Sequence, residues 1–313
     1  MPDEVSPELN AVIEAVRGLG INDGALTVME RRALISFDGP DPDGVAIERV
    51  DAGGVPSEWI VAEGAATDRA VLHLHGGAFV AGGLGSHRGF AAKLSETTGS
   101  AVLLVDYRLA PEAPFPAALD DAVAAYRWIL DRGIDPAAVV VSGDSAGGGL
   151  AASLLVALRD QGQPLPAGAV LLSPWTDLAL TGASHQSEDG RDPLCSTAML
   201  DQSAEAYLDG ADRTDPAASP LYADLSGLPP MLIHVGEVEV LRDDSVQLAE
   251  RARAAGTPVE LHVGAGMVHV WHLFADVVPE STRDQLVVAR WIATRQSLPV
   301  TTPQPEPATR RLT

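Results

Sequence analysis

The order of apolar and polar positions predicts alternating helices and strands along the chain. Apolar residues at helical spacing indicate a helical beginning over about residues 7–32, with a glycine-rich break near residue 20. Eight strand candidates follow, several of them short, wholly apolar runs of the kind that are buried on both faces of a sheet. They begin near Val45, Ser57, Ala70, Ala101, Ala138, Gly168, Pro230 and Pro258.

Helical patterns separate the later strand candidates. These stretches cover residues 86–98, 117–131, 148–161, 241–255 and 280–296. Regular alternation of strands and helices predicts an α/β protein with a mostly parallel sheet that is covered on both faces. The first two or three strands have no helices between them, so we expect them to form an antiparallel edge.

Two parts of the chain depart from this alternation. Residues 181–225 contain a helix around 197–207 and several Asp-Pro turns, and they are predicted to be an insertion over the sheet. Insertions at the carboxyl edge of an open α/β sheet commonly shape the binding crevice. Residues 41–180 and 226–297 are then the α/β core, and the proline-rich tail 298–313 is expected to be disordered.

Composition and charge exclude several kinds of partner. The net charge of −22 argues against nucleic acid and against anionic membrane surfaces. No apolar run approaches the ~20 residues that a membrane span requires. The acidic first residues show no signal-peptide pattern, so a cytoplasmic location is the expectation. Cys195 is the single cysteine, which excludes an intramolecular disulfide.

A glycine-flanked serine stands between a predicted buried strand and a predicted helix. Gly143, Ser145 and Gly147 fit the pattern G-x-S-x-G of a nucleophile elbow. In such a turn, small neighbours let a substrate carbonyl approach the serine, and the following helix directs its amide groups at the same point. Ser145 is therefore the candidate nucleophile.

A serine nucleophile needs a histidine base, and the strand–turn–helix elbow predicts the chain order serine, acid, histidine. Two histidines follow the last strand, His269 in a glycine-containing loop and His272 one helical turn later. We expect His269 to be the base and keep His272 as the alternative. The other histidines precede the serine, lie in the insertion or alternate within strands: His73, His75, His87, His185, His234 and His262.

Four carboxylates near the end of the seventh strand compete for the role of the acid. Asp243 and Asp244 lie in the first turn of the next predicted helix, where a negative charge is favourable for structural reasons alone. Glu237 and Glu239 lie at the expected carboxyl edge of the sheet. Position along the chain does not choose between these two glutamates.

The loop after the third strand is the candidate oxyanion hole. The strand runs directly into Gly76 and Gly77, whose amide groups are free to face a ligand. Three histidines lie in or near this loop, His73, His75 and His87, but none has the E-x-x-H context of a zinc site. We therefore expect neither a metal nor a cofactor.

Taken together, these motifs resemble the bacterial hormone-sensitive-lipase-like esterases of the α/β-hydrolase superfamily. The resemblance rests on H-G-G-A at residues 75–78, D-Y-R-L-A-P-E at 106–112 and G-D-S-A-G-G at 143–148. It implies an α/β-hydrolase fold with a central, mostly parallel eight-stranded sheet, helices on both faces and a helical cap. The cap would come from residues 1–40 and 181–225.

The resemblance also implies which carboxylate is the acid. The D-P-L pattern of the family falls on residues 239–241, which makes Glu239 the equivalent acid, with glutamate in place of the more common aspartate. The G-x-x-H loop of the family falls on residues 266–269 and ends at His269. The implied oxyanion donors are the amides of Gly76, Gly77 and Ala146.

The implied activity is a carboxylesterase that cleaves short- to medium-chain esters through an acyl-enzyme. A lactone hydrolase or an acyltransferase would use the same residues, and a non-catalytic receptor on this fold is a remote alternative. The expected partner is a small-molecule ester, and dimerisation through an edge strand is compatible with the fold. Four residues are expected to shape the substrate pocket: Phe79, Trp175, Met199 and Trp271.

Overall fold

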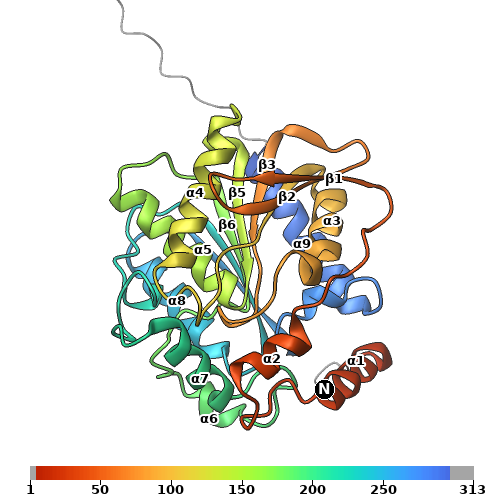
Figure 1. Cartoon of the computed structure of the whole chain (residues 1–313), viewed down its shortest axis with the longest axis vertical. Helices are drawn as coiled ribbons and strands as arrows, with labels where there is room; N and C mark the ends of the chain where they lie inside the picture. Colours follow the sequence, from red (N-terminus) through yellow and green to blue (C-terminus); the bar gives the residue numbers. More distant parts are fainter. Residues whose placement is uncertain (1–4, 297–313) are drawn as a thin grey trace, which may run out of the picture.

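A single eight-stranded sheet organises the chain. The computed structural model describes residues 5–296, and within them the strand order is β1-β2-β4-β3-β5-β6-β7-β8 (Figure 1). β1 pairs with β2 and β2 pairs with β4 in antiparallel fashion, while all the remaining neighbours are parallel. The carboxyl ends of β3 to β8 therefore meet at one edge, where ligands bind in open α/β sheets.

The strands agree closely with the apolar runs of the sequence. They are β1 (Val45–Asp51), β2 (Pro56–Ala62), β3 (Ala66–Leu74), β4 (Ser100–Val105), β5 (Val139–Asp144), β6 (Gly168–Leu172), β7 (Met231–Val238) and β8 (Val259–Val268). Every residue of β4, β5 and β6 is buried, as expected for strands covered on both faces. β1 alternates between half-buried and exposed positions because it lies at the edge of the sheet.

Helices cover both faces of the sheet. On one face lie α3 (Leu84–Thr98) and α9 (Pro279–Gln296), which also contact each other. On the other lie α4 (Ala117–Asp131), α5 (Ala146–Asp160) and α8 (Arg242–Ala254), as the two sides of Figure 1 show. Two separate clusters of buried apolar side chains fill the two interfaces. The predicted mostly parallel eight-stranded sheet with helices on both faces is thus confirmed.

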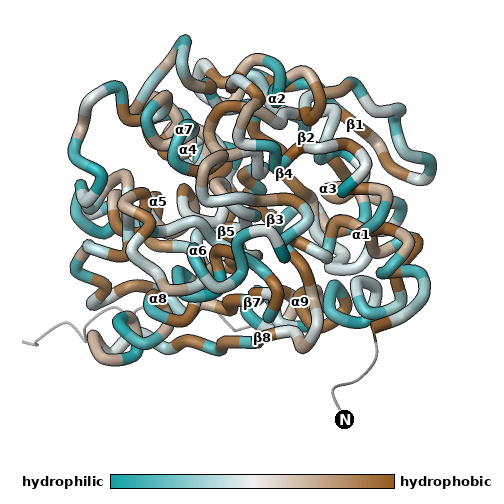
Figure 2. Tube along the Cα trace, turned by 90° about the horizontal axis from the view of Figure 1, so that it is seen from below, coloured by the Kyte–Doolittle hydropathy of each residue, from teal (hydrophilic) through white to brown (hydrophobic). Residues whose placement is uncertain are grey.

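The remaining helices gather at one end of the molecule. They are α1 (Pro7–Leu19), α2 (Val28–Ile35), α6 (Ser184–Ser187) and α7 (Thr197–Leu208), and they lie at the lower end of Figure 1. α2 contacts α7, so the N-terminal segment and the insertion meet although they are far apart in the sequence. Figure 2 views this end directly and shows the hydrophobic trace of the central strands lying between the surrounding helices.

The helical beginning of the chain consists of two helices, separated at the predicted glycine break. α1 ends where Gly20 adopts a left-handed conformation, with φ of 63°, and α2 begins at a capping box formed by Thr27 and Glu30.

Three short 3-10 helices complete the described secondary structure: η1 (Pro136–Ala138), η2 (Pro220–Tyr222) and η3 (Trp271–Phe274). Within residues 5–296, no helix is both long and apolar enough to cross a membrane. The predicted disordered tail 298–313 lies outside the described residues.

Candidate active site

Ser145 stands in a strained turn between β5 and α5. Its φ of 54° and ψ of −123° are rare for a residue with a side chain, and its amide donates to the carbonyl of Leu172 at the end of β6 over 2.8 Å. The flanking glycines are required by space. A Cβ on Gly143 would lie 2.1 Å from the carbonyl oxygen of Gly147, and one on Gly147 would lie 2.0 Å from that of Leu74.

The structure brings Ser145, His269 and Glu239 into one hydrogen-bonded row. Nε2 of His269 lies 2.9 Å from Oγ of Ser145, and Nδ1 lies 2.7 Å from Oε2 of Glu239. Because a carboxylate only accepts, Nδ1–H donates to Glu239, and Nε2 is left to accept from the serine hydroxyl. All three residues are buried, Ser145 at 7% exposure being the most open.

The surroundings of His269 favour its protonated form. Burial lowers the pKa of the imidazole, but the neighbouring Cys195 and Glu239 outweigh burial and bring the pKa well above 6.5. A carboxylate behind an imidazole stabilises the imidazolium that forms when the ring accepts a proton. The arrangement can therefore withdraw a proton from Ser145 and hold it.

The structure separates the two glutamates that the sequence left open. Glu239 has no exposed surface, and its Oε1 accepts hydrogen bonds from Ser173 over 2.9 Å and from the amide of Gly236. Glu237 is exposed and accepts instead from the amide of Gly266. Glu239 thus lies against His269, as the resemblance implied, while the carboxylate of Glu237 binds Gly266 within β8.

The competing histidine and aspartates are occupied elsewhere. Nε2 of His272 lies 3.0 Å from Nδ1 of His234, away from the serine. Asp244 accepts from the amides of Thr176 and Asp177, and Asp243 accepts from the amide of Ser184. These contacts hold the segments after β6 and β7 in place.

The three predicted oxyanion donors differ in whether their amide groups already have a hydrogen-bond acceptor. The amide of Gly76 donates to Oδ1 of Asp144 over 3.0 Å, so it is already used in this structure, which differs from the prediction. For the amides of Gly77 and Ala146, the described chain offers no hydrogen-bond acceptor. Ala146 begins α5, where unpaired amides and the positive end of the helix dipole favour an anion.

Asp144 joins the serine turn to the glycine loop. Its carboxylate accepts from Gly76, and each of its oxygens lies 3.4 Å from one histidine, His73 or His87. Burial opposes ionisation, but the two histidines outweigh it and hold the pKa of Asp144 below its usual value. The residue next to the serine is therefore a buried anion that fixes the loop of Gly76 beside Ser145.

A cavity of about 360 Å³ opens over Ser145 and His269. Apolar side chains from the N-terminal segment, the insertion and the segment after β8 line it, among them Ile21, Leu34, Met199 and Phe274. Both predicted cap segments, residues 1–40 and 181–225, thus contribute to its wall.

Of the four predicted pocket residues, the lining includes only Met199. The three aromatic ones face the core instead. Phe79 stacks on Tyr207 with ring centroids 3.9 Å apart, and Trp175 is fully buried. Trp271 is fully buried as well, and its Nε1 donates to Asp284. All three rings pack within clusters of buried apolar side chains, so the prediction that they line the pocket differs from the structure.

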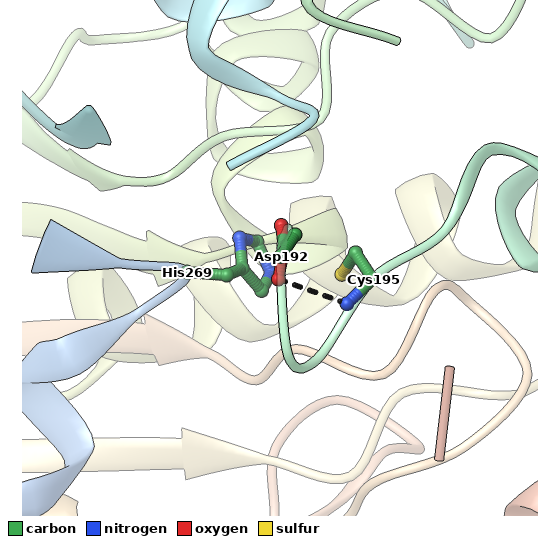
Figure 3. Close-up of side chains that lie close together, drawn as sticks. All are labelled: Asp192, Cys195 and His269. Carbon is green, nitrogen blue, oxygen red and sulfur yellow. Dashed lines mark hydrogen bonds between the residues drawn. The ribbon is translucent and has the colours of Figure 1, made fainter. Parts of the chain in front are cut away.

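Sequence analysis missed two residues beside His269. Asp192 and Cys195 lie on the loop between α6 and α7, and Figure 3 shows both beside the imidazole. Burial, together with Glu239, raises the pKa of Asp192 to about 6, although the charge of His269 opposes this. Burial likewise raises the pKa of the Cys195 thiol. An Asp-Pro turn and a single cysteine gave no sign that this loop folds back onto the last strand.

Known proteins share this fold. A family model described as alpha/beta hydrolase fold matches residues 71–273. An acetyl-hydrolase of Streptomyces hygroscopicus is 48% identical over 245 residues, which are 78% of this chain and 82% of that protein. A crystal structure of an esterase from the bacterial hormone-sensitive lipase family has a TM-score of 0.89 at 43% identity, covering 93% of this chain and 99% of that one. The crystal structure of EstE5 soaked with p-nitrophenyl butyrate has a TM-score of 0.89 at 40% identity, covering 94% and 100%.

Proposed function

Because the chain belongs to the alpha/beta hydrolase fold family, among the bacterial hormone-sensitive lipase esterases, and is a carboxylic ester hydrolase, we propose that Ser145 is its nucleophile. His269 is the base and Glu239 the orienting acid in this proposal. The substrates are small esters of short- to medium-chain carboxylic acids, which are cleaved through an acyl-enzyme.

The observation that carries this proposal is the position of His269 between the other two residues. Nε2 stands 2.9 Å from the serine hydroxyl, within reach for proton transfer, and Nδ1–H is held by Glu239 over 2.7 Å. Ser145 Oγ attacks the ester carbonyl carbon while its proton passes to Nε2. The imidazolium then gives this proton to the leaving alcohol oxygen. A water molecule repeats both steps on the acyl-enzyme and releases the acid.

The negative charge that develops on the carbonyl oxygen needs donors. Gly77 lines the cavity over Ser145, Ala146 directly follows Ser145 in the chain, and the amides of both have no acceptor within the described residues. We assign them the oxyanion. Gly76 acts through its bond to Asp144, which holds the loop so that the Gly77 amide keeps its direction.

The cavity supports a short- to medium-chain acyl group. Its volume of about 360 Å³ is near the lower end of the ~300–1,000 Å³ typical of ligand pockets, and apolar side chains dominate its wall. Exposed Leu19, Leu34 and Phe37 continue this wall outward, so a longer chain would leave along an apolar rim. Two relatives agree with small acyl groups: one is an acetyl-hydrolase, and the other was soaked with p-nitrophenyl butyrate.

A covalent serine probe and a series of esters test the proposal together. Wild type should react once per chain with a fluorophosphonate and should hydrolyse p-nitrophenyl acetate and butyrate faster than palmitate. Ser145→Ala should lose the label and lower kcat by at least about 10⁴-fold, while its unfolding temperature stays near that of wild type. Ser153→Ala, a buried serine on α5, is the matched control and should keep both. Labelling or turnover that survives in Ser145→Ala refutes the assignment.

A further inference from the structure

Three potential metal-binding side chains converge beside the catalytic row. Asp192, Cys195 and His269 each offer one ligand atom, and the three atoms lie within 4.8 Å of one another (Figure 3). None of the three residues is more than 4% exposed. Two come from the loop between α6 and α7, and the third follows β8, so the fold rather than the sequence places them together.

The set of ligands has a definite chemical preference. A thiolate, an imidazole and a carboxylate are the three ligand types of protein zinc sites. The thiolate selects thiophilic cations such as Zn²⁺ and Cd²⁺, whereas Mg²⁺ and Ca²⁺ prefer all-oxygen sites. A tetrahedral site of this kind has metal–ligand distances of about 2.0–2.3 Å. Side-chain movements on the order of an ångström would bring the three atoms to such distances.

The Asp192 carboxylate is already held in place. Oδ1 accepts from the amides of Leu194 and Cys195 over 2.9 and 3.1 Å, and Oδ2 accepts from the amide of Val240 over 3.1 Å. A ligand fixed in this way by its surroundings loses little freedom when a metal binds. Cys195 and His269 also line the cavity over Ser145, which provides a route for the ion from solvent.

We propose that Asp192, Cys195 and His269 bind a thiophilic divalent cation and that this binding inhibits the esterase. On binding, the Cys195 thiol releases its proton to solvent, and the thiolate, one carboxylate oxygen and one imidazole nitrogen become the ligands. The fourth position faces the cavity and holds water. The inhibitory half rests on the proposed function because it requires His269 to be the base.

Inhibition follows from the hydrogen bonds of the imidazole. Nδ1 is used by Glu239 and Nε2 by Ser145. A metal ion on Nε2 takes the electron pair that would accept the serine proton, and one on Nδ1 displaces Glu239. Either choice breaks the row through which the proton moves. A metal ion bound at this site therefore prevents His269 from acting as the base and does not supply a catalytic water.

Binding can be measured without any ester. Because Cys195 is the only cysteine, a thiolate-to-Cd²⁺ charge-transfer band in the ultraviolet reports this residue alone. Metal-free wild type titrated with Cd²⁺ should develop the band with an end point of one ion per chain, and so should Ser145→Ala. Asp192→Asn should weaken the Cd²⁺ affinity by about tenfold or more. The control His262→Asn, which alters a half-exposed histidine outside this site, should leave it unchanged. Absence of the band in folded wild type overturns the site.

Inhibition is then measured against each variant's own metal-free rate. Zn²⁺ should inhibit wild type, EDTA should reverse it, and Mg²⁺ at the same concentration should have no effect. Cys195→Ser and Cys195→Ala should each need at least about tenfold more Zn²⁺ for half inhibition. Equal inhibition of these variants and wild type overturns the proposal, and so does a saturated Cd²⁺ band with full activity. Loss of esterase function in metal-free wild type would refute the proposed function instead and leave the Cd²⁺ result standing.

Discussion

Ser173 donates a hydrogen bond from its hydroxyl to Oε1 of Glu239 over 2.9 Å, and its oxygen accepts from the amide of Val270 over 3.1 Å. Ser173 directly follows β6, and Val270 directly follows His269. One hydroxyl therefore connects the carboxylate behind the base to the loop that carries the base. This relation makes Ser173 a positioning residue for the proposed reaction.

Replacing Ser173 by alanine should lower kcat by about tenfold or more with little change in KM. The substitution removes the donor to Glu239 and the acceptor for Val270 but leaves the cavity wall intact. Steady-state kinetics with p-nitrophenyl butyrate provide the measurement, and the thermal unfolding temperature checks that the fold survives. Unchanged kcat in a folded Ser173→Ala variant would show that the link is dispensable.

Glutamine substitutions distinguish the two neighbouring glutamates. Glu239→Gln should lower kcat by about 10²–10⁴-fold, because an amide no longer holds Nδ1–H of His269 in place or stabilises the imidazolium. Glu237→Gln is the matched control, since its exposed side chain contacts only the amide of Gly266, and it should stay within a few-fold of wild type. A larger loss in Glu237→Gln than in Glu239→Gln would reverse the assignment of the acid.

The pH dependence of kcat/KM should report His269. The base must be neutral to accept the proton, and although burial lowers its pKa, Cys195 and Glu239 raise the pKa well above 6.5. Activity should therefore fall as the pH decreases, with the midpoint of the acid limb above 6.5. Glu239→Gln should move this midpoint to lower pH because it removes a negative charge that favours the imidazolium. A midpoint below 6.5 in wild type would contradict the prediction.

Two glycine-to-alanine substitutions should act in opposite directions. A methyl group on Gly147 would lie 2.0 Å from the carbonyl oxygen of Leu74, so Gly147→Ala should decrease the free energy of unfolding by about 3 kcal/mol or more. Gly89 lies within α3 with no atom within 4 Å of its would-be Cβ. Gly89→Ala should increase the free energy of unfolding by about 0.5–1 kcal/mol. Urea denaturation measures both, and a stable Gly147→Ala would mean that the turn can relax.

A larger side chain in the wall of the cavity should shorten the preferred acyl chain. Met199→Phe should decrease the ratio of kcat/KM for p-nitrophenyl octanoate to that for acetate several-fold, because Met199 lines the cavity over Ser145. Met29→Phe is the control: Met29 lies on α2, is 52% exposed and is not part of the lining. An equal change of the ratio in both variants would place the acyl chain elsewhere.

Local pattern was enough to predict the sheet, its helices and the serine turn. Strands such as β4 and β6 are buried along their whole length, and their mostly apolar composition predicts this burial. Ser145 was predictable because strand, glycines and helix are contiguous in the chain. His269 followed from the chain order, and Glu239 required the resemblance to a family, because Glu237 satisfies the same local rule.

The features that sequence analysis missed depend on contacts between distant segments. The amide of Gly76 is used by Asp144, 68 residues later, which no local motif shows. Asp192 accepts a hydrogen bond from the amide of Val240, 48 residues later. Phe79 was expected to shape the pocket, whereas it stacks on Tyr207 of α7. Tertiary packing decided each of these positions.

The wall of the cavity and the residues beneath it belong to different parts of the architecture. Ser145, Glu239 and His269 follow parallel strands of the sheet, whereas α1, α2 and the loop before α7 supply much of the apolar wall. Substitutions, insertions or exchange of these covering segments between related chains can alter the preferred substrate while the strand ends stay untouched. We therefore expect chimeras to combine the substrate selectivity of the protein that supplies the covering segments with the catalytic residues of the protein that supplies the sheet.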